Sequence, residues 1–363
     1  MIKNTRSLLV CHGRLFGLRE NNSISTMVKT QKYVLSKQFE GEPKRSDLTI
    51  VEEELPPLKD GEYLVEAEYL SVDPYMRAYV PRLPLGITMI GSQVAKIIES
   101  KNPDFPVTRH VVGNLGWRKH TIISGKHDTP ITDNMAPYLL PDIGDLPSSL
   151  GLGVLGMPGN TAYFGFLEIC QPKKGETAVI SGAAGAVGSH VGQIAKIYGL
   201  NVIGIAGTAS KCKWLKEELG FDHAINYKTQ DINVALKEAA PNGVDCYFDN
   251  VGGDISSTVL NHMNLFGRIS VCGSISSYNA DPKRLPKSPV IQPALVFKQL
   301  KMEGFIVNRW KNCWFEGIEK NLEWIRQGKL KYHETVTDGF ENMFDAFVGM
   351  LNGENIGKAI VKA

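Results

Sequence analysis

The feature that most constrains the fold is a cycle of short apolar strands and helices that runs from Thr177 to Cys272. The first of these strands, Thr177-Ala-Val-Ile-Ser181, is apolar without alternation, which is typical of a strand covered on both faces. Strands that alternate with helices at this interval indicate βαβ units on a doubly wound parallel sheet, so the fold class is α/β of Rossmann type. We predict strands at 177–181, 201–206, 223–227, 244–250 and 267–272, and helices at 191–198, 211–219, 232–239 and 255–264.

A glycine-rich loop, Ala183-Ala-Gly-Ala-Val-Gly188, follows the first strand and precedes the first helix. Gly185 allows the backbone to approach a pyrophosphate, and Gly188 allows the helix to pack closely on the sheet. The amino terminus of the helix attracts the anion. A glycine triplet alone can serve packing, but in this strand–loop–helix context it predicts dinucleotide binding.

The end of the second strand selects the dinucleotide. Enzymes that use NAD usually carry an acid there, which accepts the ribose hydroxyls. This strand continues as Ile205-Ala-Gly-Thr-Ala-Ser-Lys211 without an acid. Small hydroxylated residues and a lysine suit a 2′-phosphate. The alternative interpretation of Lys211 is an ordinary solvated lysine near a helix start. Because the strand end carries no acid, we predict that the cofactor is NADP(H).

The flanking segments have a different character. From Thr30 to about Pro147, short strands such as 62–70 and 91–99 are interrupted by prolines. The chain closes with an amphipathic helix at 342–351 and a strand at 358–362. We therefore predict one discontinuous β-rich domain, built from residues 27–155 and 325–363, around a Rossmann domain at 156–324.

Composition excludes several classes of protein. The net charge is +2 and the basic residues are spread along the chain, which argues against nucleic acid as a partner. The six cysteines lie far apart, which indicates neither a zinc ribbon nor a disulfide framework and favours a reducing compartment. The uncharged stretch 148–167 is broken by glycines and a proline, so we expect no membrane span.

Residues 1–26 form a segment with four basic residues and a single acid, Glu20. A mitochondrial presequence has this composition, but Gly13 and Gly17 break the amphipathic pattern of a transit helix. We expect a disordered leader without function, and a cytoplasmic protein; mitochondrial import is the alternative.

A series of motifs in order connects the chain to a known family. They are Val72-Asp-Pro-Tyr-Met-Arg77, Gly156-Met-Pro-Gly159, Tyr247-Phe-Asp-Asn-Val-Gly-Gly253, Cys272-Gly-Ser-Ile-Ser-Ser-Tyr278 and Asn355-Ile-Gly-Lys358. From Met27 to Ala363 the chain resembles the medium-chain dehydrogenase/reductase superfamily, and within it the zinc-free reductases of prostaglandins and alkenals. The resemblance implies that the β-rich domain is GroES-like and that the protein is a homodimer or a monomer.

Two departures from relatives matter. The chain lacks both the four-cysteine lobe and the Gly-His-Glu segment of zinc enzymes, so we predict no metal. Phe297 stands where some relatives carry a tyrosine, so no role of that hydroxyl transfers.

The resemblance also implies a cofactor site. The pyrophosphate lies on Gly185, Ala186, Val187 and Gly188, the adenosine phosphate meets Lys211 and Tyr227, and Asn250 meets the adjoining ribose or diphosphate. The nicotinamide is lined by Cys272, Gly273, Ser274, Ile275, Ser276, Ser277, Tyr278, Phe305, Ile306 and Val307, and Asn355 reaches it from the carboxyl-terminal segment. Structural interpretations stay open: Tyr227 ends a strand, Asn250 caps a helix, and Cys272 packs as a small hydrophobe.

The implied activity is NADPH-dependent reduction of the carbon–carbon double bond of α,β-unsaturated ketones and aldehydes. Substrates of this class are lipid enones and enals, namely 15-oxo-prostaglandins and alkenals from lipid peroxidation, and NADP-dependent oxidation of leukotriene B4 is a further implied reaction.

We select Tyr278 as the catalytic hydrogen-bond donor to the developing enolate, or to the ribose hydroxyl beside it; the alternative is a tyrosine that shapes its loop. Phe297, Phe305, Trp310 and Trp314 either wall an apolar channel or serve core or dimer packing. Alternative functions are a quinone reductase of the same superfamily and a non-catalytic NADPH-binding module.

Overall fold

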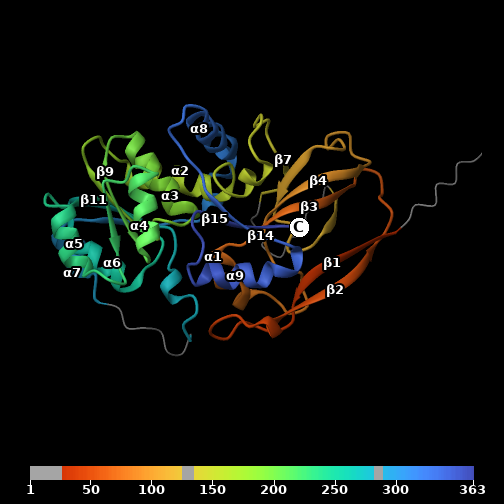
Figure 1. Ribbon diagram of the computed structural model, residues 1–363, viewed down its shortest axis with the longest axis horizontal. Helices are drawn as coiled ribbons and strands as arrows, with labels where there is room; N and C mark the ends of the chain where they lie inside the picture. Colours follow the sequence, from red (N-terminus) through yellow and green to blue (C-terminus); the bar gives the residue numbers. More distant parts are fainter. Residues whose placement is uncertain (1–26, 125–134, 282–288) are drawn as a thin grey trace, which may run out of the picture.

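The computed structural model describes residues 27–124, 135–281 and 289–363, and these form two halves with a sheet each (Figure 1). In one half, six strands pair in parallel in the order β10-β9-β8-β11-β12-β13. Chain order across this sheet is therefore 3-2-1-4-5-6, the doubly wound order. The strands are β8 (Thr177–Ser181), β9 (Asn201–Ala206), β10 (His223–Asn226), β11 (Val244–Asp249), β12 (Met263–Val271) and β13 (Lys301–Gly304).

The four predicted helices are present and connect the first five of these strands in chain order, whereas the helix between β12 and β13 was not predicted. Side chains cap two of them: Thr208 accepts the backbone N–H of Lys211 at the start of α4, and Asp231 accepts that of Val234 at the start of α5. The predicted helix 255–264 runs too far, because α6 ends at Leu260 and β12 begins at Met263. The helices are α2 (Met157–Cys170), α3 (Ala186–Ile197), α4 (Ala209–Glu217), α5 (Ile232–Ala239), α6 (Gly253–Leu260), α7 (Gln292–Phe297) and α8 (Trp314–Arg326).

The second half is built from both ends of the chain. Its seven-stranded sheet has the order β14-β15-β3-β4-β5-β7, with β6 paired to β3, and all its pairs are antiparallel except β14 with β15. The strands are β3 (Tyr63–Ser71), β4 (Gln93–Ser100), β5 (His110–Gly113), β6 (His120–Ile123), β7 (Tyr138–Leu139), β14 (Glu334–Asp338) and β15 (Lys358–Lys362). A hairpin of β1 (Val28–Leu35) and β2 (Leu48–Leu55), with α1 (Pro74–Tyr79) and α9 (Met343–Leu351), completes it. The predicted fold class, a Rossmann-type sheet with a separate β-rich domain, is confirmed; the boundaries at 155/156 and 324/325 stay predictions.

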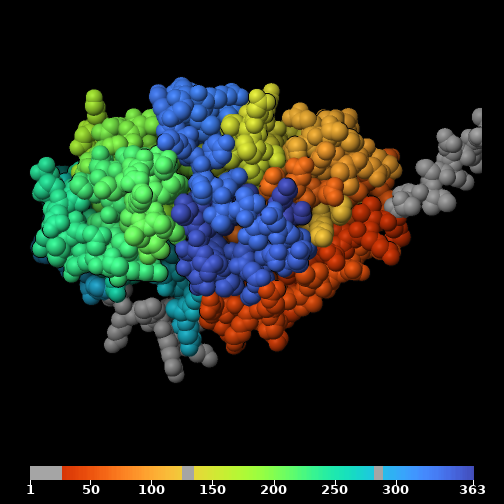
Figure 2. All heavy atoms as spheres, in the orientation of Figure 1, coloured from red at the N-terminus to blue at the C-terminus, as the bar shows by residue number. Residues whose placement is uncertain are grey.

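The two halves are joined through the carboxyl-terminal segment. The N–H of Gly357 donates to the carbonyl of Ala184 over 2.8 Å, so this segment bonds directly to the glycine-rich loop. Figure 2 shows the carboxyl-terminal residues on the surface between the two halves. A single buried cluster also combines Val94 and Val112 of the β-rich sheet with Ala178 and Val202 of the parallel sheet. The halves are therefore fastened by backbone bonds and by a shared core.

The uncharged stretch at 148–167 becomes a 3-10 turn, Ser148–Leu152, and most of α2. In the described part of the chain, no helix combines the length and the apolar character that crossing a membrane requires. Residues 1–26 lie outside the described residues, so the disordered leader stays a prediction.

Candidate active site

A cavity of about 910 Å³ lies between the two halves. It lies at the carboxyl ends of the parallel strands, beside β8, whose neighbours in the sheet are β9 on one side and β11 on the other, so that the strand order reverses there. This reversal of strand order is where open parallel sheets bind dinucleotides. The volume is at the upper end of the range for small-molecule sites. Predicted residues that line it are Gly185, Ala186, Val187, Gly188, Lys211, Tyr227, Asn250, Cys272, Gly273, Ile275, Ser276, Tyr278, Phe305, Ile306, Val307 and Asn355.

The glycine-rich loop has the geometry of an anion cradle. Gly185 is the N-cap of α3, a helix of 12 residues whose amino terminus faces the cavity. A Cβ on Gly188 would press on the carbonyl oxygen of Gly182 and lie 2.8 Å from the Cα of Ala183. Glycine at 188 is therefore required for α3 to pack against the loop.

Two lysines lie together at one end of the cavity. Lys211, in the first turn of α4, and Lys228, just after β10, both line it. Burial lowers the pKa of Lys211, and the positive charge of Lys228 lowers it further. The Nζ of Lys211 donates to the carbonyl of Gly353 over 2.6 Å. This end of the cavity attracts a dianion such as a 2′-phosphate. Lys211 was predicted from the sequence, whereas Lys228, which directly follows Tyr227, was not.

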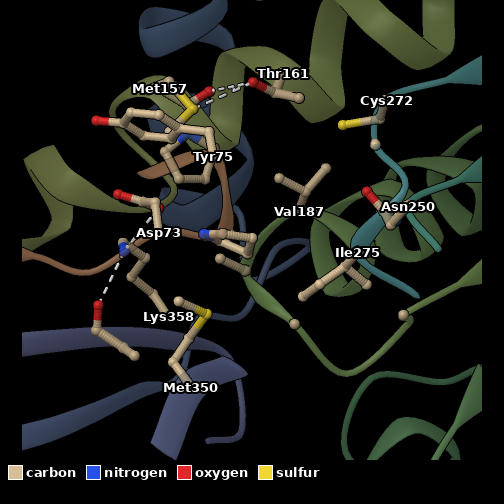
Figure 3. A pocket seen from close by; sticks show the side chains of 18 of the residues that line it. Asp73, Tyr75, Met157, Thr161, Val187, Asn250, Cys272, Ile275, Met350 and Lys358 are labelled. Atoms are coloured by element: carbon tan, nitrogen blue, oxygen red, sulfur yellow. Dashed lines mark hydrogen bonds and ion pairs between the residues drawn. The ribbon is translucent and has the colours of Figure 1, made fainter. Parts of the chain in front are cut away.

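The ends of β11 and β12 form a second wall (Figure 3). Asn250 donates from Nδ2 to the carbonyl of Ser181 over 2.7 Å, which fixes its amide beside the glycine-rich loop. Burial raises the pKa of Cys272 to about 12, so its sulfur is a neutral thiol. The packing interpretation of Cys272 is therefore compatible with its place in the wall.

Tyr278 lies at the end of the loop that follows β12. Its hydroxyl accepts the N–H of Ser274 over 3.2 Å. Burial raises its pKa, while the N–H of Ser274 acts in the opposite direction. The phenol is consequently protonated at neutral pH and keeps its proton for donation. Both interpretations of Tyr278, shaping the loop and donating a hydrogen bond, agree with this geometry.

The opposite wall comes from α1 and β15 and was missed by sequence analysis. Tyr75 and Tyr79, one helical turn apart on α1, meet edge to face at 5.5 Å and line the cavity. The Nζ of Lys358 lies 3.0 Å from Oδ1 of Asp73 on the same side of the cavity as Tyr75, and this ion pair is almost fully buried (Figure 3). Lys358 also donates to the carbonyls of Val72 and Ala359, so it fixes α1 to β15. In the sequence, the only sign of this wall was the four-residue spacing of Tyr75 and Tyr79, which places both side chains on one side of a helix.

Other predicted residues lie elsewhere. Ser274 and Ser277 are not among the described residues that line the cavity; their hydroxyls bond to each other over 2.8 Å and shape the loop. Of the four aromatic residues, Phe305 and Trp314 line the cavity, whereas Trp310 stacks on Phe164 and Phe297 is 80% exposed. The channel interpretation therefore fits two of the four residues.

No group of three or more His, Cys, Asp or Glu side chains that could hold a metal ion occurs within 27–124, 135–281 or 289–363. The expectation that no metal takes part in the reaction stays a prediction.

A doubly wound sheet with a phosphate-binding loop, facing a β-rich domain across a deep cavity, defines a dinucleotide-dependent oxidoreductase.

Two family models match the chain: the N-terminal domain of oxidoreductase at residues 31–131 and a zinc-binding dehydrogenase model at residues 186–324. Prostaglandin reductase 1 of Bos taurus is 51% identical over 93% of this chain and 100% of its own length. The NADP-dependent 2-alkenal reductase of Nicotiana tabacum is 40% identical over 92% of this chain and 97% of its own length. Among solved structures, CurA from Vibrio vulnificus in complex with NADPH is similar with a TM-score of 0.83 and 38% identity, and the match covers 92% of this chain and 99% of that one. The chain belongs to the prostaglandin reductase 1 family of the medium-chain dehydrogenase/reductase superfamily.

Proposed function

We propose that this protein reduces the carbon–carbon double bond of α,β-unsaturated ketones and aldehydes with NADPH as the hydride donor. The observation that carries the proposal is the cavity itself, in which a dinucleotide cradle with two lysines faces an aromatic wall. Relatives that share about half or two fifths of the sequence are prostaglandin and 2-alkenal reductases. 15-Oxo-prostaglandins and alkenals are therefore the proposed substrates.

The residues of the cavity fit NADPH. Gly185 to Gly188 hold the pyrophosphate at the amino terminus of α3. Lys211 and Lys228 hold the 2′-phosphate, which an acid at this strand end would repel. When bound, the cofactor would supply a hydride to the β-carbon of the enone, and the α-carbon would take its proton from water, which completes the reduction of the double bond.

The protein stabilises the negative charge that develops on the enone oxygen. The protonated phenol of Tyr278 provides a donor, which acts on the oxygen directly or through a ribose hydroxyl. Tyr75 and Tyr79 line the opposite wall and offer an aromatic surface to the substrate. Because this charge is absent from the bound substrate, its stabilisation lowers the barrier to hydride transfer without tightening the binding of the substrate.

An absorbance assay of NADPH oxidation tests this proposal. The panel contains a 15-oxo-prostaglandin, a set of alkenals and a set of quinones, and a second arm gives leukotriene B4 with NADP⁺. We expect rapid oxidation of NADPH with the enone and enals. Activity confined to quinones would assign the alternative function, and a melting-temperature shift with NADPH but no turnover would indicate a binding module.

We also propose that two copies associate as a homodimer through β13, the edge strand of the parallel sheet. Phe266 and Leu265 are more than 60% exposed, and the N–H of Phe266 donates to the carbonyl of Lys298 directly after α7. Phe297 and Val296 on α7 are exposed to at least 70%. An apolar patch beside an open strand edge is typical of an interface. Sedimentation equilibrium should give a dimer for the protein and a monomer for Phe297→Ser; a monomeric protein would contradict this.

The proposed location is the cytoplasm, and it is inferred from the cysteine pattern and from the glycines in residues 1–26. Incubation of the full chain with isolated mitochondria tests it. Import with cleavage near Ser25 would contradict the proposal.

A further inference from the structure

Arg77 is a buried cation that connects the two sides of the cavity. It lies in the last turn of α1 and is 4% exposed. Its Nε lies 2.9 Å from Oδ1 of Asn279. Its Nη2 donates to the carbonyl of Gly41 over 2.8 Å, and its guanidinium lies 5.8 Å from the ring centre of Phe39. One side chain thus joins α1, the turn after β1 and the loop after β12.

The loop that Arg77 contacts is the one that carries Tyr278. Asn279 is the next residue in the chain, and its side chain accepts the bond from Arg77. Two further hydrogen bonds of this loop stay within its own half of the molecule: Ser276 donates to the carbonyl of Val251 over 2.6 Å, and Tyr278 accepts from Ser274. Arg77 therefore gives the loop an anchor in the β-rich half.

The same short helix carries the substrate wall. Tyr75 and Tyr79 flank Arg77 in sequence and line the cavity, whereas Arg77 does not belong to the described residues that line it. Arg77 therefore connects the loop of Tyr278 to this wall without lining the cavity itself.

The chemistry of Arg77 favours a role in geometry rather than in stability. Burial lowers its pKa, an effect that the carboxylate of Asp47 partly offsets. A buried cation generally costs free energy unless it is well paired, so its presence is weak evidence for stabilisation. A planar guanidinium bonds in two directions at fixed angles, which the flexible ammonium of a lysine does not do.

We propose that Arg77 is a positioning residue, which fixes the loop of Tyr278 relative to the tyrosine wall of α1 so that the enone meets the hydride donor in one geometry. This inference rests on the proposed enone reduction. Small displacements of the reacting groups reduce turnover strongly, since hydride transfer requires a near-attack arrangement.

The experiment compares Arg77→Met, Asn279→Ala and the double variant with the unaltered protein. The control is Arg45→Met, because Arg45 lies in the same half, bonds to Asp345 and stacks over Phe344 at 5.4 Å, away from the cavity. Turnover of an alkenal is measured with NADPH and with NADPH deuterated at the transferred position. NADPH dissociation constants are measured by fluorescence titration.

We expect kcat to fall about 10- to 100-fold in Arg77→Met and at least about fivefold in Asn279→Ala. The kinetic isotope effect on kcat should rise in both, because hydride transfer becomes slower than the other steps. The double variant should be no slower than Arg77→Met, since both changes break the same contact. The NADPH dissociation constant should change less than about threefold, and Arg45→Met should match the unaltered protein.

A second readout does not depend on turnover. The N–H groups of Ser277 and Tyr278 bond within the loop, and their hydrogen exchange in the cofactor-free protein should accelerate about tenfold in both single variants. An unchanged isotope effect with a lower kcat, additive effects in the double variant, or unchanged exchange would overturn the inference. Asn279 is exposed, so Asn279→Ala should leave the fold intact and removes the same contact. This variant therefore tests the inference even if Arg77→Met does not fold. If the unaltered protein reduces no enone, the proposed function fails, while the exchange comparison still tests the contact.

Discussion

Replacement of Lys211 by methionine is the sharpest test of cofactor choice. The substitution removes a half-buried charge and keeps most of the side-chain volume. A charge-assisted contact with a 2′-phosphate contributes about 1.5–3 kcal/mol, which corresponds to a roughly 10- to 150-fold weaker binding of NADPH. Lys228 is exposed, and an exposed ion pair contributes about 0–1 kcal/mol, so Lys228→Met should weaken binding at most about fivefold.

The assay is titration of NADPH and NADH into each variant at constant ionic strength. Lys211→Met also removes the bond to Gly353, but that loss acts on both cofactors, so the ratio of the two dissociation constants isolates the phosphate contact. Lys213→Met is the matched control, because Lys213 lies on the same helix and its side chain is 71% exposed. An unchanged NADPH-to-NADH ratio in Lys211→Met would refute the assignment of this end of the cavity to the 2′-phosphate.

Three further outcomes follow from the structure. Tyr278→Phe should lower kcat about 10- to 1000-fold with little change in NADPH affinity, and unchanged turnover with rate-limiting hydride transfer would leave Tyr278 a purely structural residue. Gly188→Ala should reduce the free energy of unfolding by more than about 1 kcal/mol and abolish NADPH binding, because the added methyl group meets the backbone of Gly182 and Ala183; wild-type affinity would contradict this. Burial lowers the pKa of His190 from 6.5 to about 4, so the unfolded state takes up a proton before the folded state does. Stability should therefore be complete above about pH 6.5 and fall by up to about 1.4 kcal/mol per pH unit toward pH 4; urea unfolding of His190→Gln should lose this part of the dependence, and parallel curves would argue against it.

The parallel sheet could be predicted because its central strands carry their signal locally. Thr177–Ser181 and Asn201–Ala206 are apolar runs covered on both faces, and their predicted bounds agree with β8 and β9. Strand β13 gave no such signal, since Lys301–Gly304 lies at the sheet edge with its residues exposed or half-buried. Burial on both faces is the signal that made the central strands of this sheet predictable from the sequence.

The candidate site could be predicted on the nucleotide side and not on the substrate side. Gly188 and Lys211 follow strand ends, where the geometry of a Rossmann sheet dictates what a residue faces. Tyr75, Tyr79 and Arg77 reach the cavity or its loop through packing of one half on the other. The four-residue spacing of the two tyrosines places them on one side of a helix, but it does not show what that side faces. That contact between halves exists only in the folded chain.

The most direct test of the account is the fate of deuterium when NADPH labelled at the transferred position reacts with an alkenal in the presence of the protein. We expect a saturated aldehyde with the deuterium on its β-carbon and the carbonyl intact, because hydride transfer to the carbon–carbon double bond leaves the carbonyl carbon unlabelled. Deuterium on the carbonyl carbon, in an allylic alcohol, would contradict it.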